Sequence, residues 1–176
     1  MNKSKIVRLS HELLDKLVRP NDTIIDATLG NGYDSLYLSQ KCKFVYAFDV
    51  QEMAIENAKK TLENTSNVKP ILDSHENYQK YVNLYHGVIF NLGYLPTSDK
   101  SITTTSKTTI KTLDLMVKGS LARFILLVVY PGHPEGEIES NDLLNYIKKI
   151  TTYQVKVFRE NNNPQKAYII LLTKSV

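Results

Sequence analysis

The chain has 176 residues and a mass of 20.1 kDa, enough for one domain that buries about 70% of the surface of its unfolded form. Its net charge of +4 suits an anionic partner such as a nucleic acid without establishing one. The single cysteine, Cys42, excludes an intrachain disulfide, and no apolar run approaches the ~20 residues that span a membrane. With no apolar signal segment at the start, we expect a soluble cytoplasmic protein with one domain over residues 1–176.

Predicted helices and strands alternate along the chain. An amphipathic helix over residues 3–18 comes first, and its expected inward residues are Ile6, Leu9, Leu13, Leu14 and Leu17. Further helices are predicted at 33–41, 51–65, 108–121 and 136–150. Strands are predicted at 23–32, including a glycine turn, and at 44–50, 68–72, 84–93, 123–132, 153–160 and 166–175.

This alternation predicts an α/β fold of the Rossmann-like, doubly wound type. We expect a mostly parallel seven-stranded sheet with an antiparallel strand at the C-terminal end and helices on both faces. The segment 123–132 is nearly all apolar, as a central parallel strand should be. Ligands of such sheets bind beyond the carboxyl ends of the strands, so functional residues should follow strands.

The first strand ends in Asp26 and a turn that contains Gly30 and Gly32. Glycines let the backbone approach a ligand closely and tolerate the positive φ of a sharp turn. A carboxylate at the end of an apolar strand needs partners, so Asp26 should contact backbone amides or a ligand cation. An ordinary strand-to-helix turn is the alternative.

The second strand ends in Asp49, 49 − 26 = 23 residues after Asp26, close to the ~20 at which a carboxylate accepts ribose hydroxyls. The two acids together predict a cofactor that contains a nucleoside. A dinucleotide site would need a third glycine, which is absent, and Asp34 would place negative charge where a pyrophosphate lies. The pattern therefore favours S-adenosylmethionine over a dinucleotide or a purely structural turn.

The third and fourth strands each end in polar side chains. Asp73 follows the third strand and could accept the adenine amine, although Asp73 or Ser74 could equally cap a helix that begins at Glu76. The fourth strand ends in Asn91, followed by Gly93 and Tyr94, and its end would face the methyl group of the cofactor. The amide oxygen could accept hydrogens from an incoming amine, while the aromatic ring offers a stacking face. An asparagine before glycine is also a common turn former.

Five ordered segments carry a resemblance to one family. They are DATLGNGYDSLYL at 26–38, FDVQ at 48–51, DSHEN at 73–77, NLGYLPTSDKSITT at 91–104 and VVYPGHPEG at 128–136. The chain resembles a small family of class I methyltransferases known as rRNA methylases, and the segment 91–94 is similar to the [Asn/Asp]-Pro-Pro-[Tyr/Phe] loop of methyltransferases that act on amino nitrogens. The resemblance extends over nearly the whole chain.

The resemblance implies a tRNA methyltransferase that methylates the 5-aminomethyl group of the modified wobble uridine, with the anticodon stem-loop as its partner. The expected cofactor residues are Asp26, Thr28, Gly30, Asn31, Gly32, Asp34, Asp49, Gln51, Asp73, Ser74, His75 and Asn91. The expected catalytic residues are Asn91, Tyr94 and His133. The expected substrate-binding residues are Tyr94, Asp99, Lys100, Tyr130 and His133.

Two loops beside the expected site have open roles. The segment 97–109 carries Lys100 and Lys107, which could contact phosphates or simply belong to a mobile polar connector. The family pattern has Gly-Gly-Asp-Lys at positions 97–100, where this chain has Thr-Ser-Asp-Lys. His133 could accept a proton, contact RNA or have no chemical role.

Rival functions remain open at this point. They are a methyltransferase for rRNA or for a small-molecule amine, a non-catalytic RNA-binding module, and a nicotinamide-dependent oxidoreductase. The four histidines show no metal-ligand spacing, so no metal is expected. A homodimer that widens the basic surface is compatible with the sequence.

Overall fold

The computed structural model describes residues 4–93, 105–160 and 163–174. Its helices are α1 (Lys5–Leu17), α2 (Tyr33–Ser39), α3 (Glu52–Thr61), the 3-10 helix η1 (His75–Lys80), α4 (Ser106–Gly119) and α5 (Pro134–Ile147). Its strands are β1 (Thr23–Asp26), β2 (Phe44–Asp49), β3 (Val68–Leu72), β4 (Gly87–Asn91), β5 (Phe124–Val129), β6 (Gln154–Arg159) and β7 (Tyr168–Thr173).

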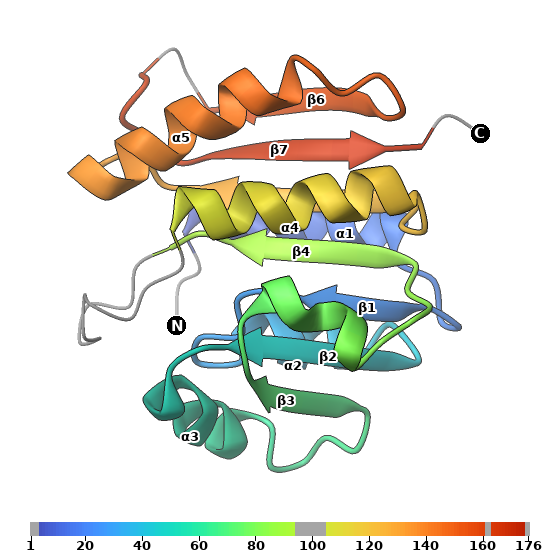
Figure 1. Cartoon of the computed structure of the whole chain (residues 1–176). Helices are drawn as coiled ribbons and strands as arrows, with labels where there is room; N and C mark the ends of the chain where they lie inside the picture. The colour runs from blue at the N-terminus through green and yellow to red at the C-terminus, as the bar shows by residue number, and fades with distance from the viewer. Residues whose placement is uncertain (1–3, 94–104, 161–162, 175–176) are drawn as a thin grey trace.

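The strands described form one sheet in the order β3-β2-β1-β4-β5-β7-β6. Strands β1 to β5 pair in parallel, whereas β7 runs antiparallel to both β5 and β6. This arrangement confirms the predicted fold class. The strand order reverses between β1 and β4, and the arrowheads of β1 to β4 point to the same side, at the left of Figure 1. That edge is where a doubly wound sheet binds its ligand.

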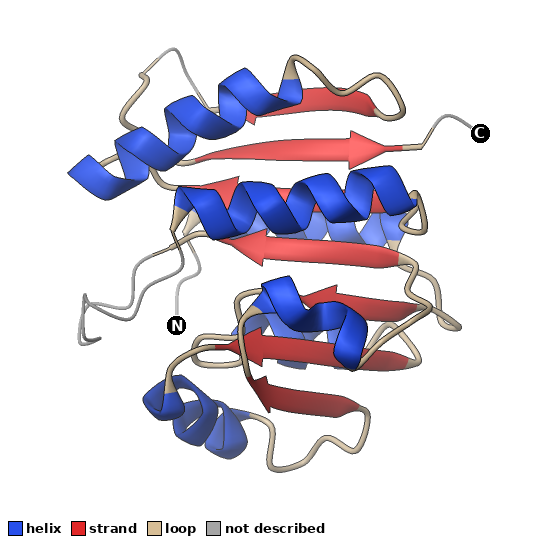
Figure 2. Cartoon of the chain, viewed as in Figure 1, coloured by secondary structure: helices blue, strands red, loops and turns tan. Residues whose placement is uncertain are grey.

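Helices cover both faces of the sheet (Figure 2). Alternate residues of each central strand enter opposite cores, so Ile24 packs with α1, α2 and α3, while Ile25 packs with α4, α5 and η1. All six residues of β5 are buried, as its apolar sequence predicts. The central strands are therefore held from both sides, and their carboxyl ends form a rigid platform for a site.

The element ends differ from the predicted ones by a few residues. The fourth strand begins at Gly87 instead of residue 84, and the helices after β4 and β5 begin two residues earlier than predicted. The turn expected at 73–77 opens the 3-10 helix η1, where the Ser74 side chain accepts a hydrogen bond from the Glu76 backbone. The capping alternative for Ser74 is thus confirmed.

Across the parts of the chain that the structure describes, there is no helix with the length and apolar character needed to cross a membrane.

Candidate active site

The turn between β1 and α2 has the conformation that its glycines predict. Gly30 has a φ of 52° and Gly32 a φ of 82°, both in the left-handed region. A side chain on Gly32 would crowd Ala58, whose Cβ would lie 3.1 Å away, whereas a Cβ on Gly30 would meet only Thr28 O, at 4.0 Å. The turn can therefore bring backbone amides close to a ligand at Gly30 while packing tightly against α3 at Gly32.

Asp26 stabilises this turn through hydrogen bonds to its carboxylate. Its carboxylate accepts hydrogen bonds from the Thr28 backbone nitrogen at 3.1 Å and from Ser35 Oγ at 2.6 Å, and it has no exposed surface. The predicted contact with backbone amides is thus present. Burial, followed by the nearby charge of Asp34, raises the pKa of Asp26 to about 7.

Asp49 lies at the end of β2, next to the turn. Its Oδ2 accepts a hydrogen bond from the Gly30 backbone nitrogen at 2.9 Å, and Oδ1 accepts one from the Gln51 backbone nitrogen at 3.0 Å. Partial burial raises the pKa of this carboxyl group. A partly exposed carboxylate beside the open space at Gly30 fits the ribose of a nucleoside cofactor, so these residues are compatible with S-adenosylmethionine.

Two further predicted cofactor residues, Asn31 and Asp73, make hydrogen bonds to neighbouring side chains or backbone. Asn31 Oδ1 accepts a hydrogen bond from Asn57 Nδ2 at 3.3 Å. Asp73 is partly exposed and accepts hydrogen bonds from the Ser74 backbone, Asn77 and Tyr81.

His75 lies in the interior rather than at the surface, with 3% of its area exposed and its Nδ1 2.8 Å from Thr112 Oγ1. Burial lowers the pKa of His75 to about 4.

Asn91 is fixed at the end of β4 by both its backbone and its side chain. The backbone nitrogen donates to Thr28 Oγ1 at 2.7 Å, which joins β4 to the turn after β1. Its Nδ2 donates to Asp34 Oδ2 at 2.8 Å, and the other oxygen of Asp34 lies 2.9 Å from His11 Nε2. The structure thus brings Asn91 and Asp34 together.

The amide oxygen of Asn91 and the ring of Tyr130 both lie close to Gly93. A Cβ built on Gly93 would be 3.5 Å from Asn91 Oδ1 and 3.3 Å from Tyr130 Cε2. Burial raises the pKa of Tyr130 to about 12. A hydrogen-bond acceptor, Asn91 Oδ1, and the edge of the Tyr130 ring are therefore both near Gly93, just after the end of β4.

His133 caps α5 in this structure. Its Nδ1 accepts a hydrogen bond from the Gly136 backbone nitrogen at 3.1 Å, and Glu135 Oε2 lies 3.4 Å from the same atom. The predicted roles in proton transfer or RNA contact stay predictions. Tyr94, Asp99 and Lys100, predicted for catalysis or substrate binding, lie outside the described residues.

Sequence reasoning missed His11. The residue is 6% exposed, and its ring stacks on Tyr37 with 3.7 Å between centroids. His11 lies one helical turn before the buried Leu14, so this ionisable residue falls within the apolar stripe of α1. That position was the signal available in the sequence, because a buried imidazole needs a partner.

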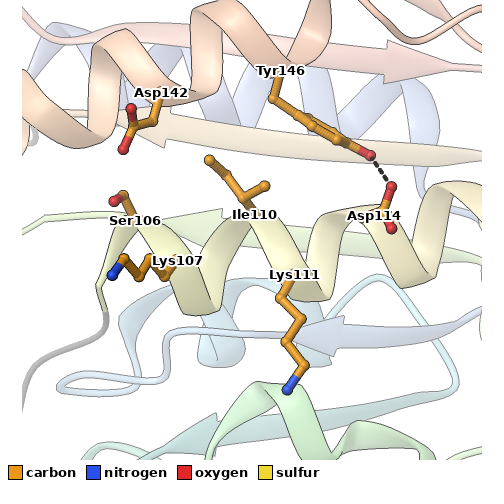
Figure 3. Close-up of a pocket in the computed structure, with 7 residues that line it drawn as sticks. All are labelled: Ser106, Lys107, Ile110, Lys111, Asp114, Asp142 and Tyr146. Carbon is orange, nitrogen blue, oxygen red and sulfur yellow. Dashed lines mark hydrogen bonds between the residues drawn. The ribbon is translucent and has the colours of Figure 1, made fainter.

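A groove of about 370 Å³ runs between α4 and α5 (Figure 3). None of the residues predicted for the cofactor, substrate or catalytic site lines this groove. Lys107, from the 97–109 segment, does line it, and both lysines and aspartates are among the lining residues. The lining residues are Ser106, Lys107, Ile110, Lys111, Asp114, Asp142 and Tyr146. No group of three or more His, Cys, Asp or Glu residues is arranged for a metal ion within residues 4–93, 105–160 and 163–174.

Comparisons with known proteins find similarity to RNA methyltransferases. A family model described as "Putative rRNA methylase" matches residues 45–174. The chain is 35% identical to the chloroplastic tRNA (mnm(5)s(2)U34)-methyltransferase of Arabidopsis thaliana, over 78% of this chain and 57% of that protein. It is 31% identical to the ribosomal RNA small subunit methyltransferase H of Streptococcus pyogenes, over 48% of this chain and 31% of that protein. The chain thus spans little more than half of the first relative and less than a third of the second.

Among solved structures, the chain is similar to a methyltransferase of Streptococcus mutans crystallised with SAH. The two share 32% identity and superpose with a TM-score of 0.87, which covers 99% of this chain and 100% of the other. The likeness extends over the whole sheet and its helices.

Proposed function

Because the chain belongs to the rRNA methylase family, we propose that it is an S-adenosylmethionine-dependent methyltransferase that methylates the aminomethyl nitrogen of 5-aminomethyl-(2-thio)uridine at the wobble position of tRNA. The name of the plant relative supports the tRNA substrate, and the SAH complex of the streptococcal structure supports the cofactor. The observation that carries the proposal is the amide of Asn91, held at the carboxyl end of β4 with its oxygen beside Gly93.

S-adenosylmethionine, when bound, supplies a methyl group on a sulfonium. Gly30 and Asp49 would hold its nucleoside part, because they offer an open backbone and a carboxylate side by side. Asn91 would address the substrate: its Oδ1 accepts a hydrogen of the neutral amine, which turns the nitrogen lone pair toward the methyl carbon. The cofactor would supply its methyl group to this nitrogen, S-adenosylhomocysteine would leave, and the methylated ammonium would lose a proton to solvent.

Alignment is the main contribution that this arrangement can make. Holding two reactants in the correct geometry can lower a barrier by roughly 7–11 kcal/mol in favourable cases. Asn91 is suited to this task because a strand, a threonine hydroxyl and a carboxylate all fix it. The ring of Tyr130 offers a face or edge against which the anticodon base could pack.

Nucleoside analysis of tRNA from a deletion strain tests the proposal. We expect the unmethylated 5-aminomethyl nucleoside to accumulate and the 5-methylaminomethyl nucleoside to disappear. Returning the gene should restore the methylated form, and returning an Asn91→Ala variant should restore far less. An unchanged tRNA profile would reject the proposed substrate.

Ribosomal RNA is the second candidate, supported by the identity to the small subunit methyltransferase H over about half of this chain. The same deletion strain separates the two, since a missing methyl group in rRNA with normal tRNA would favour this candidate.

A further inference from the structure

We propose that Asp34 and His11 form a positioning pair that fixes the rotation of the Asn91 amide, so that its oxygen and not its nitrogen faces the incoming amine. This inference rests on the proposed function and deepens it, because it explains how the substrate-facing atom of Asn91 is selected. Neither residue needs to touch the substrate.

Asp34 determines which way round the amide lies. Asn91 Nδ2 donates to Asp34 Oδ2 at 2.8 Å, and an ionised carboxylate can only accept hydrogen bonds. Rotated by half a turn, the amide would place two acceptor oxygens against each other with no hydrogen between them. The Asp34 carboxylate therefore holds Nδ2 of Asn91 on its own side, and Oδ1 of Asn91 points the other way, toward Gly93.

His11 in turn holds Asp34. Its Nε2 lies 2.9 Å from Asp34 Oδ1, and the two side chains are only 8% and 17% exposed. The imidazole is stacked on the ring of Tyr37 with an angle of 16° between the planes, so its nitrogen has a fixed position. In such a sheltered place, water competes weakly for the carboxylate, and the hydrogen bonds are stronger than at the surface.

The orientation of the amide decides whether the amine can react. An amide oxygen accepts an N–H of the amine and leaves the nitrogen lone pair free to attack. An amide nitrogen would instead donate a hydrogen bond to that lone pair and block the attack. The pair should therefore affect the methyl-transfer step much more than cofactor binding.

Kinetics with S-adenosylmethionine and tRNA that carries the 5-aminomethyl nucleoside test this role. We expect Asp34→Ala and His11→Ala to lower kcat by about 10- to 100-fold while the KM for S-adenosylmethionine stays nearly unchanged. Asp34→Asn should recover part of kcat, because its amide oxygen can still accept from Asn91. Asp114→Ala is the matched control, since Asp114 also accepts hydrogen bonds from two side chains, Lys118 and Tyr146, but lines the groove between α4 and α5 and has no hydrogen bond to Asn91 among those described.

A double-mutant cycle distinguishes positioning from cofactor contact. If Asp34 acts through Asn91, the double variant Asp34→Ala/Asn91→Ala should be no slower than Asn91→Ala alone. Additive losses in kcat, or a raised KM for S-adenosylmethionine in place of a lowered kcat, would overturn the positioning role.

NMR of the Asn91 side-chain amide tests the pair without any substrate. We expect its proton resonances to shift in Asp34→Ala and in His11→Ala and to stay in place in Asp114→Ala. If these shifts occur but the wild type does not methylate the aminomethyl nucleoside, the proposed function fails and the positioning pair stands. Methylation by the wild type without such shifts would overturn the positioning pair alone.

Discussion

At the scale of single residues, Asp26 and Asp49 end neighbouring strands, yet their carboxylates have different surroundings. Asp26 is fully buried under the glycine turn, whereas Asp49 is partly exposed beside Gly30. The first is placed to support the turn and the second to contact a ligand. Their substitution should therefore affect different properties of the protein.

For Asp49→Ala, we expect the affinity for S-adenosylmethionine to fall by about 10- to 100-fold, because a charged hydrogen-bond partner is lost. The kcat should change less, since the residue is not placed at the reacting atoms. Calorimetry and steady-state kinetics measure the two effects. Asn91→Ala is the converse control, with kcat reduced and affinity nearly retained. An intact affinity in Asp49→Ala would remove this residue from the cofactor site.

For Asp26→Asn, we expect a change in the pH dependence of stability. Folding raises the pKa of Asp26 from 3.8 to about 7, so between these values the native state holds a proton that the unfolded state has released. The contribution of Asp26 to stability therefore falls as pH rises from about 4 to 7.

The side chain at position 26 of the Asp26→Asn variant does not titrate between about pH 4 and 7. Over this range the free energy of unfolding of the variant should therefore rise by about 2–4 kcal/mol relative to that of the wild type. Urea unfolding at both pH values measures the difference. The opposite effect of His75, whose pKa is lowered to about 4, cancels in the comparison because both proteins contain it. A difference that does not vary with pH would show that Asp26 has an ordinary pKa.

At the scale of elements, Gly87 and Phe124 determine how β4 lies beside β5. The two residues are paired in the sheet, and the ring of Phe124 occupies the space where a side chain on Gly87 would lie. We expect Gly87→Ala to destabilise the protein by about 1–3 kcal/mol through overpacking. Denaturant unfolding measures the loss. Adding Phe124→Leu should recover part of it, and a further loss would contradict the packing explanation.

The elements themselves were predictable from the sequence, because each is an apolar run of the right period bounded by turn residues. Within the described part of the chain, all the strands of the sheet and the five α-helices were predicted, and Asn91 was correctly placed at a strand end. The 3-10 helix at 75–80 was predicted only as an alternative, a helix beginning at Glu76, because so short an element has no periodicity to detect.

Contacts between distant segments were harder to predict. Asp34 and Asn91 are 57 residues apart, and His11 and Asp34 are 23 apart, so no local pattern links them. His75 was expected at the cofactor because it follows a strand, but packing against α4 takes its ring inside.

At the scale of the whole molecule, the direction of α4 places an exposed lysine at the ligand edge of a positively charged protein. The protein carries +4, and α4 begins at that edge with the exposed Lys107 and ends at the opposite edge with Lys118. Binding of a tRNA would release counterions in proportion to the phosphates contacted, whereas binding of a small amine would not. Salt dependence therefore separates the proposed substrate from a small-molecule one.

We expect the affinity for tRNA to fall steeply between about 50 and 200 mM salt, with a linear plot of log K against log salt concentration. Lys107→Ala should lower the slope of that plot by about 1 if its ammonium contacts a phosphate. Lys118→Ala is the matched control on the same helix and should leave the slope unchanged, because its ammonium pairs with Asp114 far from the ligand edge. Fluorescence anisotropy with a labelled anticodon stem-loop measures both slopes. Equal slopes in the two variants would place the phosphate contacts elsewhere on the protein, and a flat plot for the wild type would argue against an RNA substrate.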